Sequence, residues 1–251
     1  MSVQASAGPS AMSRLAPNLG DHLAGRIDAT PLETAPFDHV YVENLFPPDL
    51  YRELRHKDAI QADGTSARRE FYLFPEHVAL LPAKIRAIWT EVSRATRSSG
   101  LQDAFKRKFK MALEGRFERD IDRLNFYVIP ILVRDLGGYR ISIHDDSGRK
   151  AITVQLYLPH DDSQAHLGTR FHEGRDGDAA ERVKALKFRP STAYAFPVVP
   201  GKTWHSVART TPADGARDSL MMTYYVQDHP LDFWKQRSKR YREFAGRFFR
   251  D

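Results

Sequence analysis

The 251-residue sequence contains no cysteine. This absence excludes disulfide scaffolds, zinc fingers, iron–sulfur clusters and thiol nucleophiles, because each of these needs the cysteine sulfur. Any metal site in the chain must therefore use histidine, aspartate or glutamate side chains.

Long apolar runs are absent as well. No uninterrupted stretch approaches the roughly 18 residues that a membrane-spanning helix needs, and the mean hydropathy is −0.52. The opening segment, MSVQASAGPSAMSRLAPNLG, lacks the apolar core of a secretion signal. The sequence therefore predicts a soluble protein of the cytoplasm.

The charge balance leans to the basic side, with 38 basic and 32 acidic side chains and a net charge of +6. An excess of basic side chains is typical of proteins that bind nucleic acid, so nucleic acid is a candidate partner. However, residues 235–250 hold seven basic side chains and one acidic one, which equals the whole excess. The aromatic residues of this segment share one apolar side, so a solvated helix face is favoured over a platform for single-stranded nucleic acid.

The chain is predicted to consist of one arm and one domain. Residues 1–35 are rich in Ala, Ser, Pro and Gly without a sustained period, which indicates a flexible N-terminal arm. Residues 36–251 are predicted to form a single domain, with a β-rich core at about 120–227 and a C-terminal helix at 231–250.

Several helices are expected to flank the core. One begins at Pro48, after a short strand at Val40–Val42. Two amphipathic helices follow, because apolar residues recur every three or four positions. Their stripes are Ile85, Ile88, Trp89 and Val92, and then Leu101, Phe105, Phe109 and Leu113.

Six β-branched and aromatic runs lie between residues 124 and 226, separated by Gly, Pro, Asp and Ser. They are LNFYVIPILV, YRISIHDD, AITVQLYLP, TAYAFPVV, WHSVAR and RDSLMMTYYV. This pattern predicts an α+β, mainly β protein built on an antiparallel sandwich or barrel. The polar, Gly-interrupted stretch 161–187 predicts a functional lid or insertion.

A histidine and an aspartate end the second run. On an extended backbone, His144 and Asp146 project to one face while Asp145 points away. An imidazole and a carboxylate at this spacing can bind one side of a metal ion. His205, 59 residues after Asp146, is the best candidate for a third ligand.

Two histidines and one carboxylate match the facial triad of non-haem Fe(II) oxygenases, which leaves coordination positions open for other ligands. A lone His-x-Asp is weak evidence, because the chain has ten histidines. The other histidines are expected to be solvated residues of the polar stretch (His160, His166, His172) or strand-edge and turn residues (His39, His77, His229).

The last run adds a second chemical feature. Arg217 and Ser219 begin one face of this strand, and a guanidinium with a hydroxyl two residues on can bind a carboxylate in a barrel mouth. The alternative is an arginine exposed at a strand start.

The ordered set GGYRISIHDD, ITVQLYLP, HLGT, AFPVVPGKTWHSV and RDSLMMTYY resembles the Fe(II)/2-oxoglutarate-dependent dioxygenases. It is most similar to the prolyl-hydroxylase-like branch that includes bacterial small-molecule oxygenases. The resemblance covers roughly residues 120–227 and implies a double-stranded β-helix, or jelly-roll, core with flanking helices.

The resemblance also implies roles for particular residues. His144, Asp146 and His205 would ligate Fe(II), and Arg217 would bind the distal carboxylate of 2-oxoglutarate with help from Ser219. Tyr157 falls where relatives place a hydroxyl on that carboxylate, and an aromatic residue of the core is an equal alternative. Thr153 and Gln155 share the face of Tyr157, so they are within reach of the cofactor, but no role is assigned to them.

The implied reaction is oxidation of an unactivated C–H bond of a small molecule by O2, with release of succinate and CO2 and with ascorbate in support. Halogenating relatives carry a small residue in place of Asp146, so hydroxylation, desaturation or ring closure is expected. Two other functions stay open: a hydroxylase or demethylase of nucleic acid or protein, and a non-catalytic, cupin-like metal- or ligand-binding protein.

Substrate contacts are the least specified part of the sequence. Tyr139, Arg140 and Arg134 precede the His-x-Asp motif and are candidates for the pocket mouth, while Arg170 and His172 are candidates for a cap. Arginines there would suit an anionic substrate. The sequence predicts neither the identity of the substrate nor the oligomeric state.

Overall fold

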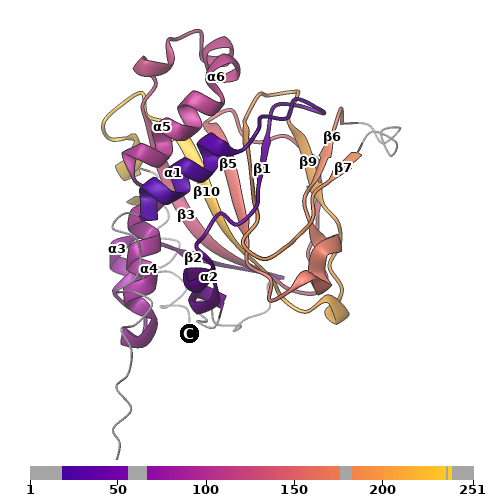
Figure 1. Ribbon diagram of the computed structural model, residues 1–251. Helices are drawn as coiled ribbons and strands as arrows, with labels where there is room; N and C mark the ends of the chain where they lie inside the picture. Colours follow the sequence, from indigo (N-terminus) through magenta and orange to yellow (C-terminus); the bar gives the residue numbers. More distant parts are fainter. Residues whose placement is uncertain (1–18, 56–66, 176–182, 236, 239–251) are drawn as a thin grey trace, which may run out of the picture.

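The computed structural model describes residues 19–55, 67–175, 183–235 and 237–238. Two antiparallel sheets face each other, and helices cover the outer face of the larger one (Figure 1). Within these residues, no helix combines the length and the apolar character needed to cross a membrane.

The larger sheet has the strand order β1-β8-β5-β10-β3-β2, and the smaller one has the order β4-β9-β6-β7. The strands are β1 (Val40–Val42), β2 (Arg68–Tyr72), β3 (Phe126–Asp135), β4 (Ile141–His144), β5 (Lys150–Tyr157), β6 (Arg170–His172), β7 (Val183–Ala185), β8 (Ala193–Pro197), β9 (Trp204–Val207) and β10 (Arg217–Val226).

The α-helices are α1 (Leu19–Ala29), α2 (Pro48–Arg55), α3 (Pro75–Val78), α4 (Ala83–Ala95), α5 (Ser99–Lys108) and α6 (Lys110–Phe117). Within the described ranges, the short 3₁₀ helices are η2 (Ile121–Arg123), η3 (Asp162–Leu167) and η5 (Pro212–Asp214).

The chain from β3 to β10 passes back and forth between the two sheets, which makes the core a double-stranded β-helix. The predicted fold class is therefore confirmed. Each of the six runs singled out in the sequence contains a strand, namely β3, β4, β5, β8, β9 and β10.

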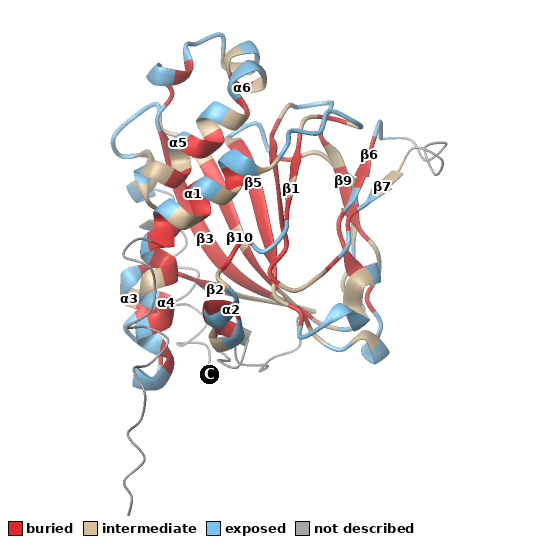
Figure 2. Cartoon of the chain, viewed as in Figure 1, coloured by how far each residue is buried: buried red, intermediate tan, exposed pale blue. Residues whose placement is uncertain are grey.

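The two faces of the larger sheet have different partners, because side chains alternate along each strand. On β5, Ile152, Val154 and Leu156 pack into one large apolar cluster with the inner faces of α1, α4 and α5. Figure 2 shows these buried faces as red bands on the helices and on the sheet. Burial of each large apolar side chain stabilises the fold by roughly 1.5–3 kcal/mol.

The opposite face of the same strands is turned toward the smaller sheet and carries polar groups. Thr153, Gln155 and Tyr157 lie across from Thr223, Met221 and Ser219 in the register of β5 with β10. The polar members of this row are buried. Both faces of these strands are thus buried, one apolar against helices and one polar inside the barrel.

Two predictions about the ends of the chain are changed by the structure. The predicted flexible arm is wrong for residues 19–29, which form α1, and its apolar face (Leu19, Leu23, Ile27) belongs to the main core. The domain boundary at residue 36 is therefore placed too late. Residues 1–18 and most of the predicted C-terminal helix lie outside the described residues, but 232–235, 237 and 238 are helical.

Two further predictions needed correction. The prediction that 161–187 forms a lid or an insertion is wrong for its described residues, since they supply η3 and strands β6 and β7 of the smaller sheet. The stripe from Leu101 to Leu113 belongs to two helices, because Phe109 between them leaves helical geometry with φ −111° and ψ 21°.

Gly168 joins η3 to β6 in a space that excludes a side chain. A Cβ atom there would lie 1.8 Å from the backbone oxygen of Leu186. We expect Gly168→Ala to lower the free energy of unfolding by about 1–3 kcal/mol in urea denaturation, because backbone must move. The control Gly25→Ala, in α1 with nothing within 4 Å, should leave stability unchanged or raise it by up to about 1 kcal/mol. Equal effects of the two substitutions would contradict this account.

Candidate metal centre

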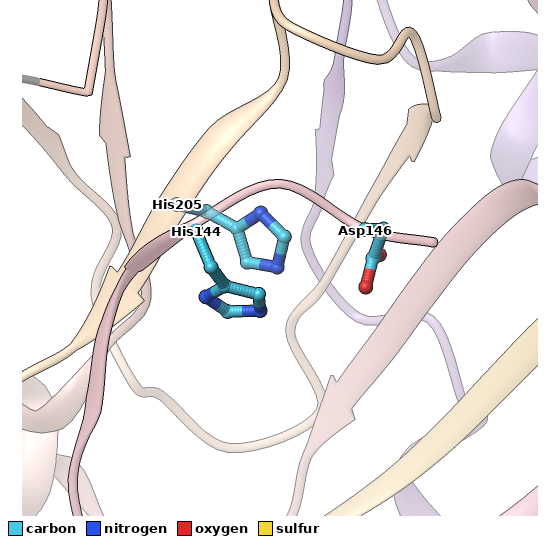
Figure 3. A group of neighbouring side chains, drawn as sticks. All are labelled: His144, Asp146 and His205. Atoms are coloured by element: carbon cyan, nitrogen blue, oxygen red, sulfur yellow. The ribbon is translucent and has the colours of Figure 1, made fainter. Parts of the chain in front are cut away.

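Strands β4 and β9 bring two histidines together. His144 and His205 are direct cross-strand partners, and their ring centroids lie 4.3 Å apart. Asp146 follows two residues after His144, where the chain leaves β4. One ligand atom from each of the three side chains lies within 4.8 Å of the others, and Figure 3 shows the three side chains gathered in one place.

Both imidazoles are oriented by backbone carbonyl groups. The Nδ1 atom of His144 lies 3.0 Å from the carbonyl oxygen of Ser142, and that of His205 lies 3.0 Å from the carbonyl oxygen of Thr203. A carbonyl oxygen can only accept, so Nδ1 carries the proton in each ring. The lone pair of each Nε2 is then available to a metal ion, the arrangement that metal-binding histidines usually show.

The protonation states suit a cation. Burial lowers the pKa of His205 to about 4, although the charge of Asp146 opposes the shift, so this ring is neutral at pH 7. Burial acts to raise the pKa of Asp146, but the charges of Lys150 and His205 and the hydrogen bonds from Lys150 and Thr153 outweigh it. The pKa of Asp146 is therefore lowered, and the carboxylate is ionised.

Two side chains of β5 support the carboxylate. Lys150 Nζ donates to Asp146 Oδ1 at 2.5 Å, and Thr153 Oγ1 donates to Asp146 Oδ2 at 2.5 Å. Neither contact was predicted from the sequence. A register shift between Tyr224 and Tyr225 pairs Lys150 with Tyr225, and no local sequence pattern indicates this bulge.

The three donors fit a divalent transition metal. Two neutral imidazole nitrogens and one carboxylate oxygen are the ligand types of a two-histidine, one-carboxylate iron site. Across the described ranges, no other group of three such side chains meets at comparable distances. Asp145 is turned elsewhere, since its Oδ2 accepts a hydrogen bond from the backbone N–H of Gly201 at 2.8 Å.

Arg217 is completely buried, which rejects the alternative of an exposed arginine at a strand start. Its Nη1 donates to Asp135 Oδ2 at 2.9 Å, and its Nε donates to the carbonyl oxygen of Leu167 at 2.9 Å. Asp135 also accepts from Arg68, so one carboxylate serves two guanidinium groups. Nη2 of Arg217 is buried and has no hydrogen-bond partner among the described residues.

An orphaned N–H group on a buried cation is costly, and a bound anion would satisfy it. Tyr157 lies beside this group, with its ring centroid 5.5 Å from the guanidinium carbon of Arg217. The hydroxyl of Tyr157 accepts from the backbone N–H of Thr169 at 2.9 Å. The arrangement fits the carboxylate of a small acid.

A hydrogen-bonded chain fills the interior next to Arg217. Ser219 Oγ accepts from Gln155 Nε2 at 2.7 Å, and Gln155 Oε1 accepts from the Tyr194 hydroxyl at 2.7 Å. Burial strongly raises the pKa of Tyr194, so its hydroxyl stays protonated. Ser219, a predicted contact of 2-oxoglutarate, therefore lies inside the barrel. Tyr194 lies there as well, and no sequence pattern singled it out.

Two of the three candidate substrate residues contact other charged groups, and the third is exposed. Arg134 lies on the opposite face of β3 from Asp135, with its Nε 2.8 Å from Asp218 Oδ1. Arg140 is exposed. Tyr139 packs against Arg68, whose guanidinium carbon is 4.2 Å from the centroid of the tyrosine ring. Arg68 donates to Asp135, the carboxylate that also accepts from Arg217, so Tyr139 lies on the Arg217 side of the barrel.

The two candidate cap residues lie on β6. Arg170 is exposed, whereas His172 is buried and its Nε2 lies 2.8 Å from Ser206 Oγ. The prediction that His172 is solvated is therefore wrong. The same prediction is right for His166, whose side chain is 61% exposed beside Asp214.

A cavity of about 580 Å³ lies at the rim of the barrel between α6, residues 36–38 and the β8–β9 connection. Its wall includes Arg116, Gly201 and Thr203, three residues that contact the segments carrying the cluster. Arg116 donates to the carbonyl oxygens of Gly148 and Lys150 at 2.6 Å each. The cavity size is typical of small-molecule sites.

No protein-family model and no curated protein matches the sequence. Several solved structures are similar to the chain. A prolyl-4-hydroxylase from Pseudomonas putida has a TM-score of 0.48 at 15% identity, over 81% of this chain and 98% of that one. A 2OG-Fe(II) oxygenase-family oxidoreductase from Burkholderia pseudomallei has a TM-score of 0.49 at 12% identity, over 83% and 90%.

HygX from Streptomyces hygroscopicus, with nickel and 2-oxoglutarate bound, has a TM-score of 0.45 at 10% identity, over 76% of this chain and 83% of that one. Identities this low transfer no residue's role to this chain.

The buried imidazole of His205 makes the stability of the metal-free protein depend on pH. With a pKa of about 4 in the folded state and 6.5 as its ordinary value, the unfolded chain takes up a proton first as the pH falls. Stability should therefore fall as the pH decreases from about 6.5 to 4, by up to about 3 kcal/mol from this residue.

Urea unfolding at several pH values, with a chelator present, measures this dependence. His205→Gln should lose less stability than the wild type across the window, whereas His166→Gln, at an exposed site, should follow the wild type. Identical pH profiles for the wild type and His205→Gln would show that His205 is not held neutral.

Proposed function

We propose that this chain is an Fe(II)- and 2-oxoglutarate-dependent oxygenase that hydroxylates, or otherwise oxidises, a C–H bond of a small molecule. The observation that carries the proposal is that the His144, Asp146, His205 cluster and the unsatisfied N–H of Arg217 face the same barrel interior. One end of that interior suits a divalent cation, and the other suits a carboxylate.

The spacing of these two ends supports a dicarboxylic co-substrate. Thr153, which contacts Asp146, and Tyr157, which adjoins Arg217, lie four residues apart on β5. The two ends therefore lie at different points along one strand. A ligand that joins them needs one group that binds a metal ion and one anionic group at its far end, as a dicarboxylate has.

Each part of the barrel would have a defined task. His144, Asp146 and His205 would hold the iron, which supplies activation of O2 and of the keto acid when bound. Arg217 would bind the distal carboxylate, with Tyr157 against the guanidinium and Ser219 held in the adjoining hydrogen-bonded chain. The buried interior would exclude water, and the apolar ring of Phe196, centred 5.0 Å from that of His205, would shield one side of the ligand.

A small-molecule substrate is the version we favour. The 580 Å³ cavity at the barrel rim is of suitable size and lies against the segments that carry Asp146 and His205. Of the basic C-terminal residues, Arg237 is ion-paired with Glu76, which weakens the case for nucleic acid. Support by ascorbate and location in the cytoplasm stay predictions.

Turnover of 2-oxoglutarate tests the proposal against a non-catalytic metal-binding protein. We expect the Fe(II)-loaded wild type to convert 2-oxoglutarate to succinate in air, slowly without substrate, and Asp146→Ala to lose this activity by at least about 100-fold, because a charged ligand is removed. Equal succinate formation by both proteins, or none by the wild type, would refute the assignment.

The carboxylate site has a separate test. Arg217→Met should raise the KM for 2-oxoglutarate by about 10- to 100-fold, since a charge-assisted pair is lost. Arg134→Met, on the other face of the sheet, is the matched control and should leave that KM unchanged. Calorimetric titration of the metal-loaded proteins with 2-oxoglutarate should show the same difference, and equal affinities in the two variants would contradict the role of Arg217.

A further inference from the structure

Lys150 enters the barrel because of an irregularity in β5. Strict alternation would place it on the face of Ile152, which packs against the helices. The register shift instead pairs Lys150 with Tyr225, whose ring stacks on that of Tyr127 at 5.3 Å on the interior side. The bulge therefore turns a cationic side chain toward the metal ligands.

The ion pair that results is well enclosed. The side chain of Lys150 is 22% exposed and that of Asp146 is 5% exposed. The backbone of Lys150 is fixed too, because its carbonyl oxygen accepts from Arg116. Lys150 and Thr153 each donate to one oxygen of Asp146, so the carboxylate is held in direction without a metal ion.

The charges at the site indicate that the ammonium of Lys150 competes with a metal ion. Two neutral imidazoles and one carboxylate carry a net charge of −1, and Lys150 already neutralises it. A divalent ion that binds Asp146 Oδ1 competes with the ammonium for that oxygen and lies close to a like charge in a buried site, where such repulsion is poorly screened. Thr153 donates a hydrogen bond from a neutral hydroxyl, so it does not repel a metal ion.

We propose that Lys150 is a resident counter-ion of Asp146 that a divalent metal replaces. It holds the ligand carboxylate in place while the site is empty, and it lowers the affinity of the site for metal. Lys150 is thus a positioning residue that sets metal affinity. This inference rests on the metal centre of the proposed function, but not on catalysis.

Metal binding itself provides the test, with free Mn(II) measured by electron paramagnetic resonance during titration of the metal-free protein. Lys150→Met should bind Mn(II) about tenfold more tightly than the wild type, because the competing charge is gone. Lys150→Arg keeps the charge and should stay near the wild-type affinity. Thr153→Val, which removes an orienting hydrogen bond, should bind about tenfold more weakly. Lys150→Gln is a second neutral variant should Lys150→Met fold poorly.

Thermal unfolding gives a second readout, in which Lys150→Met should weaken the metal-free protein rather than strengthen it. Metal-free Lys150→Met should melt below the metal-free wild type, because Asp146 loses its partner. Saturating Mn(II) should reduce or reverse this difference in melting temperature between Lys150→Met and the wild type.

Weaker or unchanged Mn(II) binding in both neutral variants would overturn the inference and leave the proposed function intact. His144→Ala should abolish binding, which ties the signal to this site. Absence of Mn(II) binding by the wild type would instead overturn the metal centre and, with it, this inference.

Discussion

The two-residue alternation along β5 and β10 is the constraint on which the rest of the structure depends. Each strand must satisfy two buried environments at once, an apolar one against the helices and a polar one inside the barrel. Ile152 and Leu220 serve the first environment, whereas Thr153 and Ser219 serve the second. A one-residue slip would exchange the two sets and dismantle the core and the site together. The fold and the chemistry are therefore specified by the same register.

The barrel interior is electrically polarised. Asp146 lies near one end and accepts hydrogen bonds from Lys150 and Thr153, whereas Arg217 lies near the other end and shares the carboxylate of Asp135 with Arg68. Buried charges at both ends are tolerated because each has a partner, yet each retains unused capacity. At one end this capacity is the pair of free imidazole nitrogens, and at the other it is the unpaired Nη2 of Arg217. A metal ion and a dicarboxylate would complete both ends.

Much of this arrangement follows from the sequence, because it depends on strand alternation. His144 and Asp146 share a face by their spacing, and Arg217 begins the strand whose polar face lines the barrel. Other features depend on pairings that no local pattern reveals. Lys150 reaches Asp146 only through a bulge, and Asp135 meets Arg217 only in the register of β3 with β10. Strands β6 and β7 were missed because each has only three residues, too few to show a period. Helix α1 was missed although Leu19, Leu23 and Ile27 recur every four residues, the spacing of an amphipathic helix.

A crystal structure of the protein with Mn(II) and 2-oxoglutarate, from crystals grown without oxygen, tests most directly whether the barrel holds a metal ion at one end and a dicarboxylate at the other. The account predicts one metal ion on Nε2 of His144, Nε2 of His205 and an oxygen of Asp146, with the distal carboxylate of 2-oxoglutarate on Nη2 of Arg217. The ammonium of Lys150 should have left the metal-bound oxygen. A metal ion bound elsewhere, or a dicarboxylate that does not reach Arg217, would contradict the account.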